Sequence, residues 1–346
     1  SLVVSEMAYL DGENVVFEEL TGWNGAAIYN FGDITLVGAE FRNNDASDQG
    51  IILNRGTMTL TDVVFDSNSA FELGVISNEG SLTISEGVFQ NNSVWLDSII
   101  YNEGILEISR SEFHDNLGQM GGVIYNAEES ELNLEEVEFV NNAGGLGGAI
   151  YNQGVVEIVQ GEFIDNRAPD GGAIYNKGVM EIAESEFTGN QATNNGGAIS
   201  NHGGLEITDS RFMDNVAEDE EAPNGGGSGG AIYNTDELSL TRVEFGGNRT
   251  DGSGGAIWSG KNLRITDSYI HDNRAMGGGG LYVSMAYGQG HNVMITGTTF
   301  SYNEASQSGG GAYLVDAAVI VNSTFTGNEA ATSGGGIDFS GDLLVL

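Results

Sequence analysis

Residues 147–190 read GGAIYNQGVVEIVQGEFIDNRAPDGGAIYNKGVMEIAESEFTGN. The hexapeptide Gly-Gly-Ala-Ile-Tyr-Asn begins at Gly147 and again at Gly171. A second pattern, Phe-x-x-Asn, follows each copy at the same distance, at Phe163 and at Phe187. A fixed period of this size identifies a repeat protein, and it decides the fold before any local propensity does.

Working outward, the Phe-x-x-Asn pattern recurs along nearly the whole chain. Its first residues are Phe41, Phe65, Phe89, Phe113, Phe139, Phe163, Phe187, Phe212, Phe245, Phe300 and Phe325, with Ile270 in the one gap. Between the two patterns lies an apolar-x-apolar pair, such as Val156/Ile158. Three short alternating segments in every period predict three short β-strands in each repeat. One such coil cannot bury a core, so successive coils must stack and pair their strands in parallel.

The sequence therefore predicts an all-β fold, a right-handed parallel β-helix (a solenoid) of about 13 coils, each of roughly 24 residues and three strands. We expect residues 1–346 to form a single β-helix domain with an irregular N-terminal part at 1–16. The repeat lengthens at about 217–228 and 283–292, which predicts loop insertions there. Neither end resembles a cap, so we expect a fragment of a longer protein.

Equivalent positions in stacked coils should form ladders of like side chains. We expect the large apolar positions to fill the core and the asparagines to stand at corners, where they bond one another's amides and the turn backbone. The ladder residues of the two quoted repeats are Ile150, Ile174, Phe163, Phe187, Asn152, Asn176, Asn166 and Asn190.

The charge balance limits the choice of partners. The chain has 50 acidic and 11 basic residues, which gives a net charge of −39. This charge repels nucleic acid and anionic lipid, so we expect no nucleic-acid partner and no membrane insertion by this segment. The absence of cysteine excludes disulfides and thiolate metal sites.

An aromatic residue follows the core isoleucine in many coils. Strand alternation predicts that these side chains point outward. One interpretation is a self-stacking row that supports the sheet, and the other is a flat face that binds a glycan, a protein or another copy. The candidate contact residues are Tyr125, Tyr151, Tyr175, Tyr233, Trp258 and Tyr282, together with Met285 and Tyr287 of the second insertion.

Glutamates also recur in register and should face solvent. The simple interpretation is a solvated acidic face, and the alternative is cation binding, for which Ca²⁺ would suit an oxygen-only ligand set. The weak metal candidates are Glu157, Glu181, Glu206, Glu218, Asp219, Glu220 and Glu221. We expect no required cofactor.

Catalysis has to be considered, because parallel β-helices include polysaccharide lyases and hydrolases. The four histidines fall at different repeat positions, the arginines are scattered, and no adjacent Asp-Asp pair occurs. We therefore predict no catalytic or cofactor-binding residues and no enzyme. A polysaccharide-active enzyme is kept as the least favoured alternative.

The alternation of Gly-Gly-Ala-Ile with Phe-x-x-Asn, from about Gly25 to Phe339, resembles the repeats of the polymorphic outer membrane proteins. That resemblance implies the β-helical passenger of a chlamydial-type autotransporter adhesin, displayed extracellularly or on the cell surface, with any outer-membrane attachment lying outside this chain. It implies a binding or structural rod used for adhesion or self-assembly. Its expected partner is a surface glycan, a protein receptor or a second copy joined end to end. A filament or surface-layer subunit is the alternative. The lack of cysteine departs from the chlamydial members.

Overall fold

The computed structural model describes residues 2–23, 26–48, 50–218, 226–284, 292–315, 317–341 and 343–345, with Leu343 described by its backbone alone. Every helix or strand within these residues is a β-strand, and all pairings between the named strands are parallel. The strands form three sheets, here called A, B and C, over about 13 turns. The predicted all-β parallel solenoid with three strands per coil is therefore confirmed.

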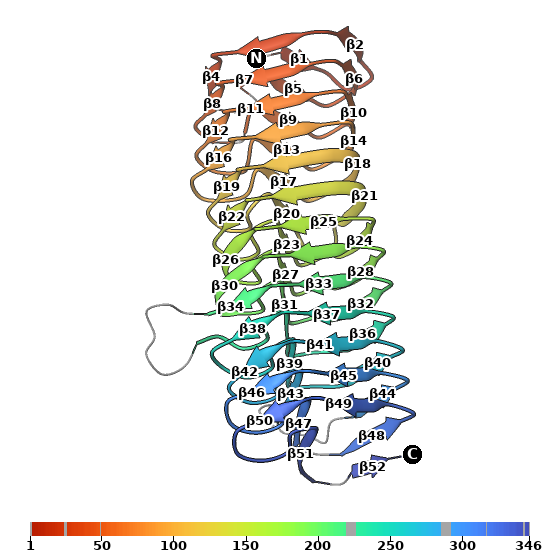
Figure 1. Cartoon of the computed structure of the whole chain (residues 1–346). Helices are drawn as coiled ribbons and strands as arrows, with labels where there is room; N and C mark the ends of the chain where they lie inside the picture. Colours follow the sequence, from red (N-terminus) through yellow and green to blue (C-terminus); the bar gives the residue numbers. More distant parts are fainter. Residues whose placement is uncertain are drawn as a thin grey trace. The chain divides into compact units, whose positions relative to one another are not determined.

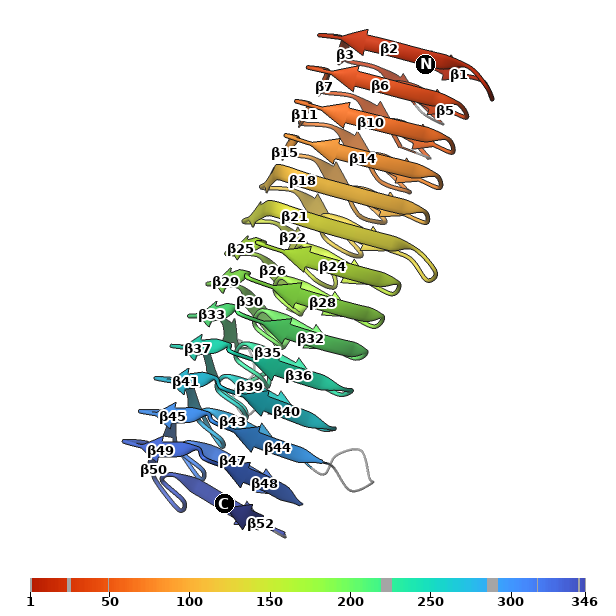
Figure 2. The same cartoon turned by 90° about the vertical axis from the view of Figure 1, so that its right-hand side faces the viewer.

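The chain divides into two compact units, Ser1–Arg167 (unit 1) and Ala168–Leu346 (unit 2). Each coil of either unit runs from a sheet A strand through two segments of sheet B to a sheet C strand. Figure 1 shows β5, β9, β13 and β17 of sheet A side by side in unit 1. Figure 2 shows sheet B, with β6, β10 and β14 adjacent in unit 1 and β36, β40 and β44 adjacent in unit 2.

The strands of unit 1 have the following bounds. Sheet A contains β1 (Leu2–Val4), β5 (Ile28–Asn30), β9 (Ile52–Asn54), β13 (Ile76–Asn78), β17 (Ile100–Asn102), β20 (Ile124–Asn126) and β23 (Ile150–Asn152). Sheet B contains β2 (Tyr9–Glu13), β3 (Val16–Glu18), β6 (Asp33–Val37), β7 (Glu40–Arg42), β10 (Thr57–Thr61), β11 (Val64–Asp66), β14 (Ser81–Ser85), β15 (Val88–Gln90), β18 (Ile105–His114), β21 (Glu131–Val140), β24 (Val155–Val159) and β25 (Glu162–Ile164). Sheet C contains β4 (Thr21–Gly22), β8 (Asp45–Ala46), β12 (Ser69–Ala70), β16 (Ser93–Val94), β19 (Leu117–Gly118), β22 (Ala143–Gly144) and β26 (Arg167–Asp170), which begins at the last residue of the unit.

The strands of unit 2 repeat this order. Sheet A contains β27 (Ile174–Asn176), β31 (Ile199–Asn201), β35 (Ile232–Asn234), β39 (Ile257–Ser259), β43 (Leu281–Val283), β47 (Ala312–Val315) and β51 (Ile337–Ser340). Sheet B contains β28 (Val179–Ala183), β29 (Glu186–Thr188), β32 (Gly204–Thr208), β33 (Arg211–Met213), β36 (Leu238–Thr241), β37 (Glu244–Gly246), β40 (Leu263–Thr266), β41 (Tyr269–His271), β44 (Val293–Thr296), β45 (Thr299–Ser301), β48 (Ala318–Val321), β49 (Thr324–Thr326) and β52 (Leu343–Val345). Sheet C contains β30 (Gln191–Asn195), β34 (Val216–Ala217), β38 (Arg249–Thr250), β42 (Arg274–Ala275), β46 (Glu304–Ala305) and β50 (Glu329–Ala330).

The core is a set of ladders of identical side chains. Phe41 and Phe65 stack with ring centroids 4.4 Å apart, and Phe187 and Phe212 stack at 4.6 Å. All four side chains are fully buried. Burying each of these large side chains stabilises the fold by about 1.5–3 kcal/mol, so the repeat period directly sets the stability of every coil.

Asparagine ladders stand at two corners of most coils. Asn102 Nδ2 donates to Asn126 Oδ1 at 2.8 Å, and Asn102 Oδ1 accepts from the backbone N–H of Gly104. At the second corner, Asn116 Nδ2 donates to Asn142 Oδ1 at 3.0 Å and to the carbonyl of Phe89 at 2.9 Å. These bonds satisfy a turn N–H and a strand carbonyl beside the corners, so the asparagine side chains hold neighbouring coils together.

Two bends per coil have left-handed backbone that the repeat pattern did not reveal. Asp115 (φ 54°) precedes one corner asparagine, and Glu184 (φ 51°) lies within a bend of sheet B. The same two bends hold Asp, Asn, Ser, Glu, Gln, Arg, Gly or, once, Tyr in other coils. Because short polar residues and glycine tolerate this conformation best, the bends depend on backbone geometry and leave no single-letter signature.

Residues 1–16 were expected to be irregular, and this expectation is wrong. β1 pairs with β5, with Leu2 opposite Ile28, and β2 pairs with β6, with Leu10 opposite Ile34. This stretch supplies the sheet A strand and the first sheet B strand of a coil. It lacks the repeat letters, since Val4 stands where the next coil has a corner asparagine and Gly12 stands where it has a second large apolar residue.

Candidate binding surfaces

The aromatic row of unit 1 lies beside the core of sheet A. Tyr101 and Tyr125 stack with ring centroids 5.0 Å apart, and Tyr125 meets Tyr151 edge-on at 5.2 Å. Burial raises the pKa of both the Tyr101 and the Tyr125 hydroxyl, and the nearby carboxylates of Glu103 and Asp97 add to the rise. The row is therefore a packed structure with little free ring surface.

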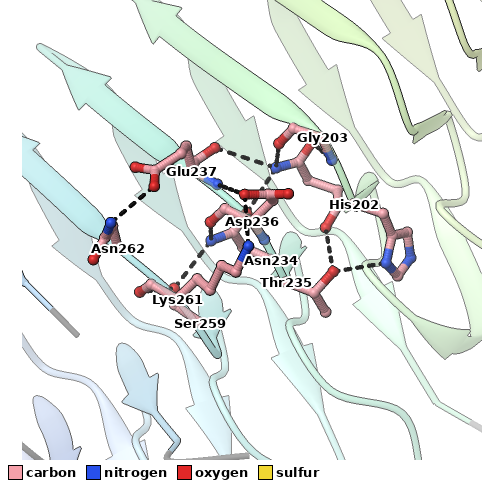
Figure 3. A network of polar contacts seen from close by, with 10 residues as sticks. His202, Gly203, Asn234, Thr235, Asp236, Glu237, Ser259, Lys261 and Asn262 are labelled. Atoms are coloured by element: carbon pink, nitrogen blue, oxygen red, sulfur yellow. Dashed lines mark hydrogen bonds and ion pairs between the residues drawn. The ribbon is translucent and has the colours of Figure 1, made fainter. Parts of the chain in front are cut away.

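In unit 2 a histidine completes the row where an aromatic residue is missing. Ser200 occupies the aromatic position, and the His202 ring fills the space, 4.9 Å from Tyr175 and 6.0 Å from Tyr233. His202 Nδ1 lies 2.7 Å from Thr235 Oγ1 (Figure 3). Burial lowers the pKa of His202, so the neutral ring that packs best in the row is favoured. Two further pairs stack in this unit, Tyr233 on Trp258 at 4.4 Å and Tyr282 on Tyr313 at 4.8 Å.

The aromatic side chains lie on the outward side of their strands, as strand alternation predicts, but they are less exposed than outward side chains usually are. Tyr151 and Trp258 are buried, at 4% and 7% exposure, and Leu53 and Ser77 at the same position are also buried. The glycine turn lies against the base of the row, since a Cβ placed on Gly121 would come within 2.7 Å of the Tyr151 Cβ. The other candidates in the row are half-buried, namely Tyr125, Tyr175, Tyr233 and Tyr282. This geometry favours the self-supporting interpretation of the row.

A different set of apolar side chains is exposed in unit 1, next to sheet C. We call it the corner patch, and its members are Phe71 (48% exposed), Trp95 (66%), Leu96 (46%), Leu117 (46%) and Met120 (48%). Leu96 donates its backbone N–H to the Phe71 carbonyl, and Ser93 pairs in register with Leu117, so the patch covers adjacent coils. Trp23, at the same coil position as Phe71 and Trp95, is 77% exposed.

The corner patch was missed because no letter repeats in it. One signal was available, since the separations between Trp23, Phe71 and Trp95 are whole multiples of the repeat period. Large exposed side chains at one coil position lie on one face, so spacing alone could have assembled them.

Asp97 borders the corner patch and is unusual for a carboxylate. Burial raises its pKa to about 6, although the backbone N–H of Ser98 donates to its Oδ1 at 3.0 Å. It stands three residues before the core Ile100, where later coils have a glycine such as Gly147 or Gly171. The turn therefore encloses a side chain at a position that normally has none.

The outer face of sheet B is acidic in unit 1, as expected. A shallow hollow of about 390 Å³ lies over β18, β21 and β24, and Glu107, Glu135 and Glu157 line it. Glu107 pairs in register with Asn133, and Asn133 pairs with Glu157. The alternation with asparagine keeps the two exposed glutamates two coils apart, which limits their repulsion.

The outer face of sheet B in unit 2 forms a larger groove of about 1250 Å³. Glu181 and Glu206 stand in register at one end, and Met294 and Val319 stand in register at the other. Arg264 lies between them on β40 and is exposed.

The candidate metal ligands are dispersed in the part of the chain that the structure describes. Glu218 pairs with Arg249 at 2.9 Å, and Glu181 and Glu206 form a pair of neighbours in sheet B. Among the described residues, no three His, Asp or Glu side chains meet in an arrangement that could hold a metal ion. Asp219, Glu220 and Glu221 lie outside the described residues, as do the insertion residues Met285 and Tyr287.

The register shows where the two insertions enter. Ile199 pairs with Ile232, a longer step than the usual repeat, so the first extra segment falls between β34 and β35. Ile270 pairs with Phe300, again a longer step, and the second extra segment falls between β43 and β44. Both insertions therefore extend turns and leave the strand ladders in register.

Three segments of the chain match the model of the Chlamydia polymorphic membrane protein (Chlamydia_PMP) repeat, at residues 161–177, 184–202 and 242–260. Each segment contains both the Phe-x-x-Asn and the Gly-Gly-Ala-Ile pattern, and all lie on the parallel solenoid described above. The chain is a Pmp-like β-helix repeat protein. Pmp repeats belong to adhesin-type passengers rather than enzymes, and they suggest a surface-exposed autotransporter passenger at the cell surface or outer membrane.

No curated protein matches the chain. Within the described residues, no helix has the length and apolar character needed to cross a membrane. The Pmp-like repeats therefore identify the scaffold, and the outward side chains must identify what the scaffold binds.

Proposed function

We propose that this Pmp-like chain is an extracellular adhesin-type binding module that contacts a surface glycan or protein receptor through the corner patch of unit 1. The observation that carries this proposal is the exposure of five large apolar side chains on adjacent coils of a chain with a net charge of −39. Single exposed apolar residues are ordinary on protein surfaces, whereas a contiguous group marks an interaction site.

The composition of the corner patch suits recognition. Trp95 and Phe71 provide flat faces that can stack on a sugar ring or pack into a protein pocket. Met120 and the two leucines add adaptable apolar area around them. A partner that covers the patch removes this area from water, and each fully covered large side chain contributes about 1.5–3 kcal/mol.

Binding without catalysis fits the rest of the surface. The exposed glutamates of sheet B lie in rows set by the repeat, and His202 serves packing of the aromatic row. The proposed activity requires no cofactor, and Ca²⁺ would act through the acidic rows if it binds.

The test replaces Phe71 and Trp95 by serine and measures adhesion to a glycan array and to intact cells. We expect the double variant to bind at least about tenfold more weakly, a loss of about 1.4 kcal/mol. The matched control is Met276→Ser, which changes an exposed side chain (40%) at the equivalent coil position of unit 2 and should leave adhesion unchanged.

Self-assembly is the other use of an apolar patch, and sedimentation separates the two. Association of the wild-type chain that disappears in the Phe71/Trp95 double variant, without any array or cell binding, would replace adhesion by a filament or surface-layer role. Adhesion that survives in the double variant would remove the corner patch from the proposal.

A further inference from the structure

The central outward column of sheet B in unit 2 changes its chemistry along the groove. Read coil by coil, the column is Glu181, Glu206, Ser239, Arg264, Met294 and Val319. Neighbouring members are about 4.8 Å apart, because each belongs to the next parallel strand. The groove is therefore acidic at one end, cationic at its centre and apolar at the other end.

Arg264 differs from the other arginines of unit 2. Each of the others forms an ion pair with a carboxylate on the protein surface. The pairs are Arg211 with Glu244 at 2.9 Å, Arg242 with Asp209 at 2.6 Å, Arg249 with Glu218 at 2.9 Å and Arg274 with Glu304 at 3.9 Å. Within the described part of the chain the Arg264 guanidinium has no ion pair or hydrogen-bond partner, although its backbone pairs in sheet B and glutamates line the same groove. Its guanidinium is thus available to take a carboxylate in a two-bond geometry.

The rim of the groove is already organised. Asn262 Nδ2 donates to Glu237 Oε1 at 2.8 Å, and Asn292 donates its backbone N–H to Asn262 Oδ1 at 3.0 Å (Figure 3 shows the first bond). The nearby cation Lys261 is held by Asp236 at 3.0 Å. Lys261 therefore already has a partner, and among the described residues that line the groove Arg264 is the basic one.

The order of these groups indicates the kind of occupant. A polysaccharide with a short repeat presents the same groups at every step, whereas this groove presents different groups at successive coils. A polypeptide can match such an order with its side chains. Because the strands of the floor already pair on both sides, recognition must use side chains rather than an added strand.

The length of the column is also suitable. From Glu181 to Val319 the column crosses five strand spacings, about 24 Å, which corresponds to about seven residues of extended peptide. The two in-register glutamates at one end repel each other by on the order of 0.9 kcal/mol in water before salt screening, so basic side chains there would be favoured.

We propose that the groove of unit 2 binds an extended polypeptide segment of a partner protein. The basic side chains of that segment lie over Glu181 and Glu206. Its carboxylate pairs with Arg264, and its apolar side chains lie over Met294 and Val319. The groove belongs to unit 2 and the corner patch to unit 1, so either proposal can fail while the other stands.

The probe is a labelled ten-residue peptide with lysine at its first and third positions, aspartate at the fifth, leucine at the seventh and ninth, and serine between them. It is made in both chain directions, and a peptide of the same composition in scrambled order is the comparison. Because all have the same net charge, attraction to the acidic protein is equal for all. We expect fluorescence anisotropy to show at least about tenfold tighter binding of one ordered peptide.

Arg264→Glu should abolish that preference and create one for the peptide in which lysine replaces the aspartate. Arg274→Glu makes the same charge change on sheet C of unit 2 and should leave the preference intact. Circular dichroism checks that both variants keep the fold. Equal binding of ordered and scrambled peptides, equal effects of the two variants, or Arg264-dependent binding of a polygalacturonate oligosaccharide instead of the peptides would each overturn the proposal.

Discussion

Units 1 and 2 are alike inside and different outside. At the coil position that follows the first two residues of each sheet C strand, unit 1 has Trp23, Ser47, Phe71, Trp95, Gln119 and Gly145, whereas unit 2 has Pro169, Thr193, Glu218, Asp251, Met276, Ser306 and Ala331. On the outer face of sheet B the contrast is the opposite one. The central outward residues of unit 1 are all polar, whereas those of unit 2 change from acidic through basic to apolar along the groove. Core packing constrains the inward side chains of every coil, so only the outward side chains can differ between the units and determine what each unit binds.

The largest effect should come from the phenylalanine ladder, where the cores of the two units are predicted to be equivalent. Phe113→Ala in unit 1 and Phe212→Ala in unit 2 each remove a fully buried ring stacked on both sides. We expect both to lower the free energy of unfolding by about 3–5 kcal/mol in chemical denaturation. A large effect in one unit alone would show that the two cores are not equivalent.

Substitutions in the asparagine ladder should lower the free energy of unfolding by a smaller amount, again equally in the two units. Asn102 exchanges amide bonds with Asn78 at 2.7 Å and Asn126 at 2.8 Å, and Asn201 has equivalent partners in unit 2. Replacing either Asn102 or Asn201 by alanine leaves buried partners unsatisfied, and we expect about 2–3 kcal/mol of destabilisation. The Thr59→Ala change, at a half-buried position on the outer face of sheet B, serves as the control and is expected to stay within about 0.5 kcal/mol.

Asp97 offers a pH test confined to unit 1. Its folded pKa of about 6 lies above the ordinary value of 3.8, so the folded chain holds a proton that the unfolded chain releases between these values. The contribution of Asp97 to the free energy of unfolding is therefore fully present below pH 4 and is lost as the pH rises through 6. We expect Asp97→Asn to be more stable than wild type by on the order of 2 kcal/mol at pH 7.5, with the difference shrinking toward pH 4. A pH-independent difference would show that Asp97 ionises normally.

The smallest effect should come from the acidic columns common to both units. Raising NaCl from 20 mM to 500 mM shortens the Debye length to a few ångströms and screens the repulsion of in-register glutamates. We expect the melting temperature to rise by a few degrees, because screening removes less than about 1 kcal/mol of repulsion for each pair of glutamates. CaCl₂ at matched ionic strength should give the same rise, and a much larger one would establish a Ca²⁺ site.

The sequence predicted the parts of this molecule that depend on identical side chains. Ile150, Phe163 and Asn152 could be placed because ladders require the same shape in every coil. Strand alternation placed the aromatic row on the outward side correctly, but Tyr151 and Trp258 are buried, since alternation takes no account of neighbouring rings or of the glycine turn against the base of the row. The polar residues at the left-handed bends vary, because backbone conformation alone is required of them.

The binding surfaces were harder to predict for the same reason. The position of Phe71 and Trp95 accepts almost any residue, so no repeated letter marks it. Arg264 stands out only when its neighbours in the coils before and after are known, because the sequence does not show which described carboxylates come near its guanidinium. Sequence periodicity therefore fixes the scaffold and leaves the contact residues to the three-dimensional register.

Oxidative footprinting of the chain on intact cells to which it adheres tests the central claim, that the outward face of unit 1 makes the contact. Hydroxyl radicals label exposed methionine and aromatic side chains, so Phe71, Trp95, Met120 and Met276 report in one experiment. We predict that adhesion protects Phe71, Trp95 and Met120 while Met276 of unit 2 is labelled as in the free chain. Equal labelling of the corner patch in bound and free chain would contradict the account.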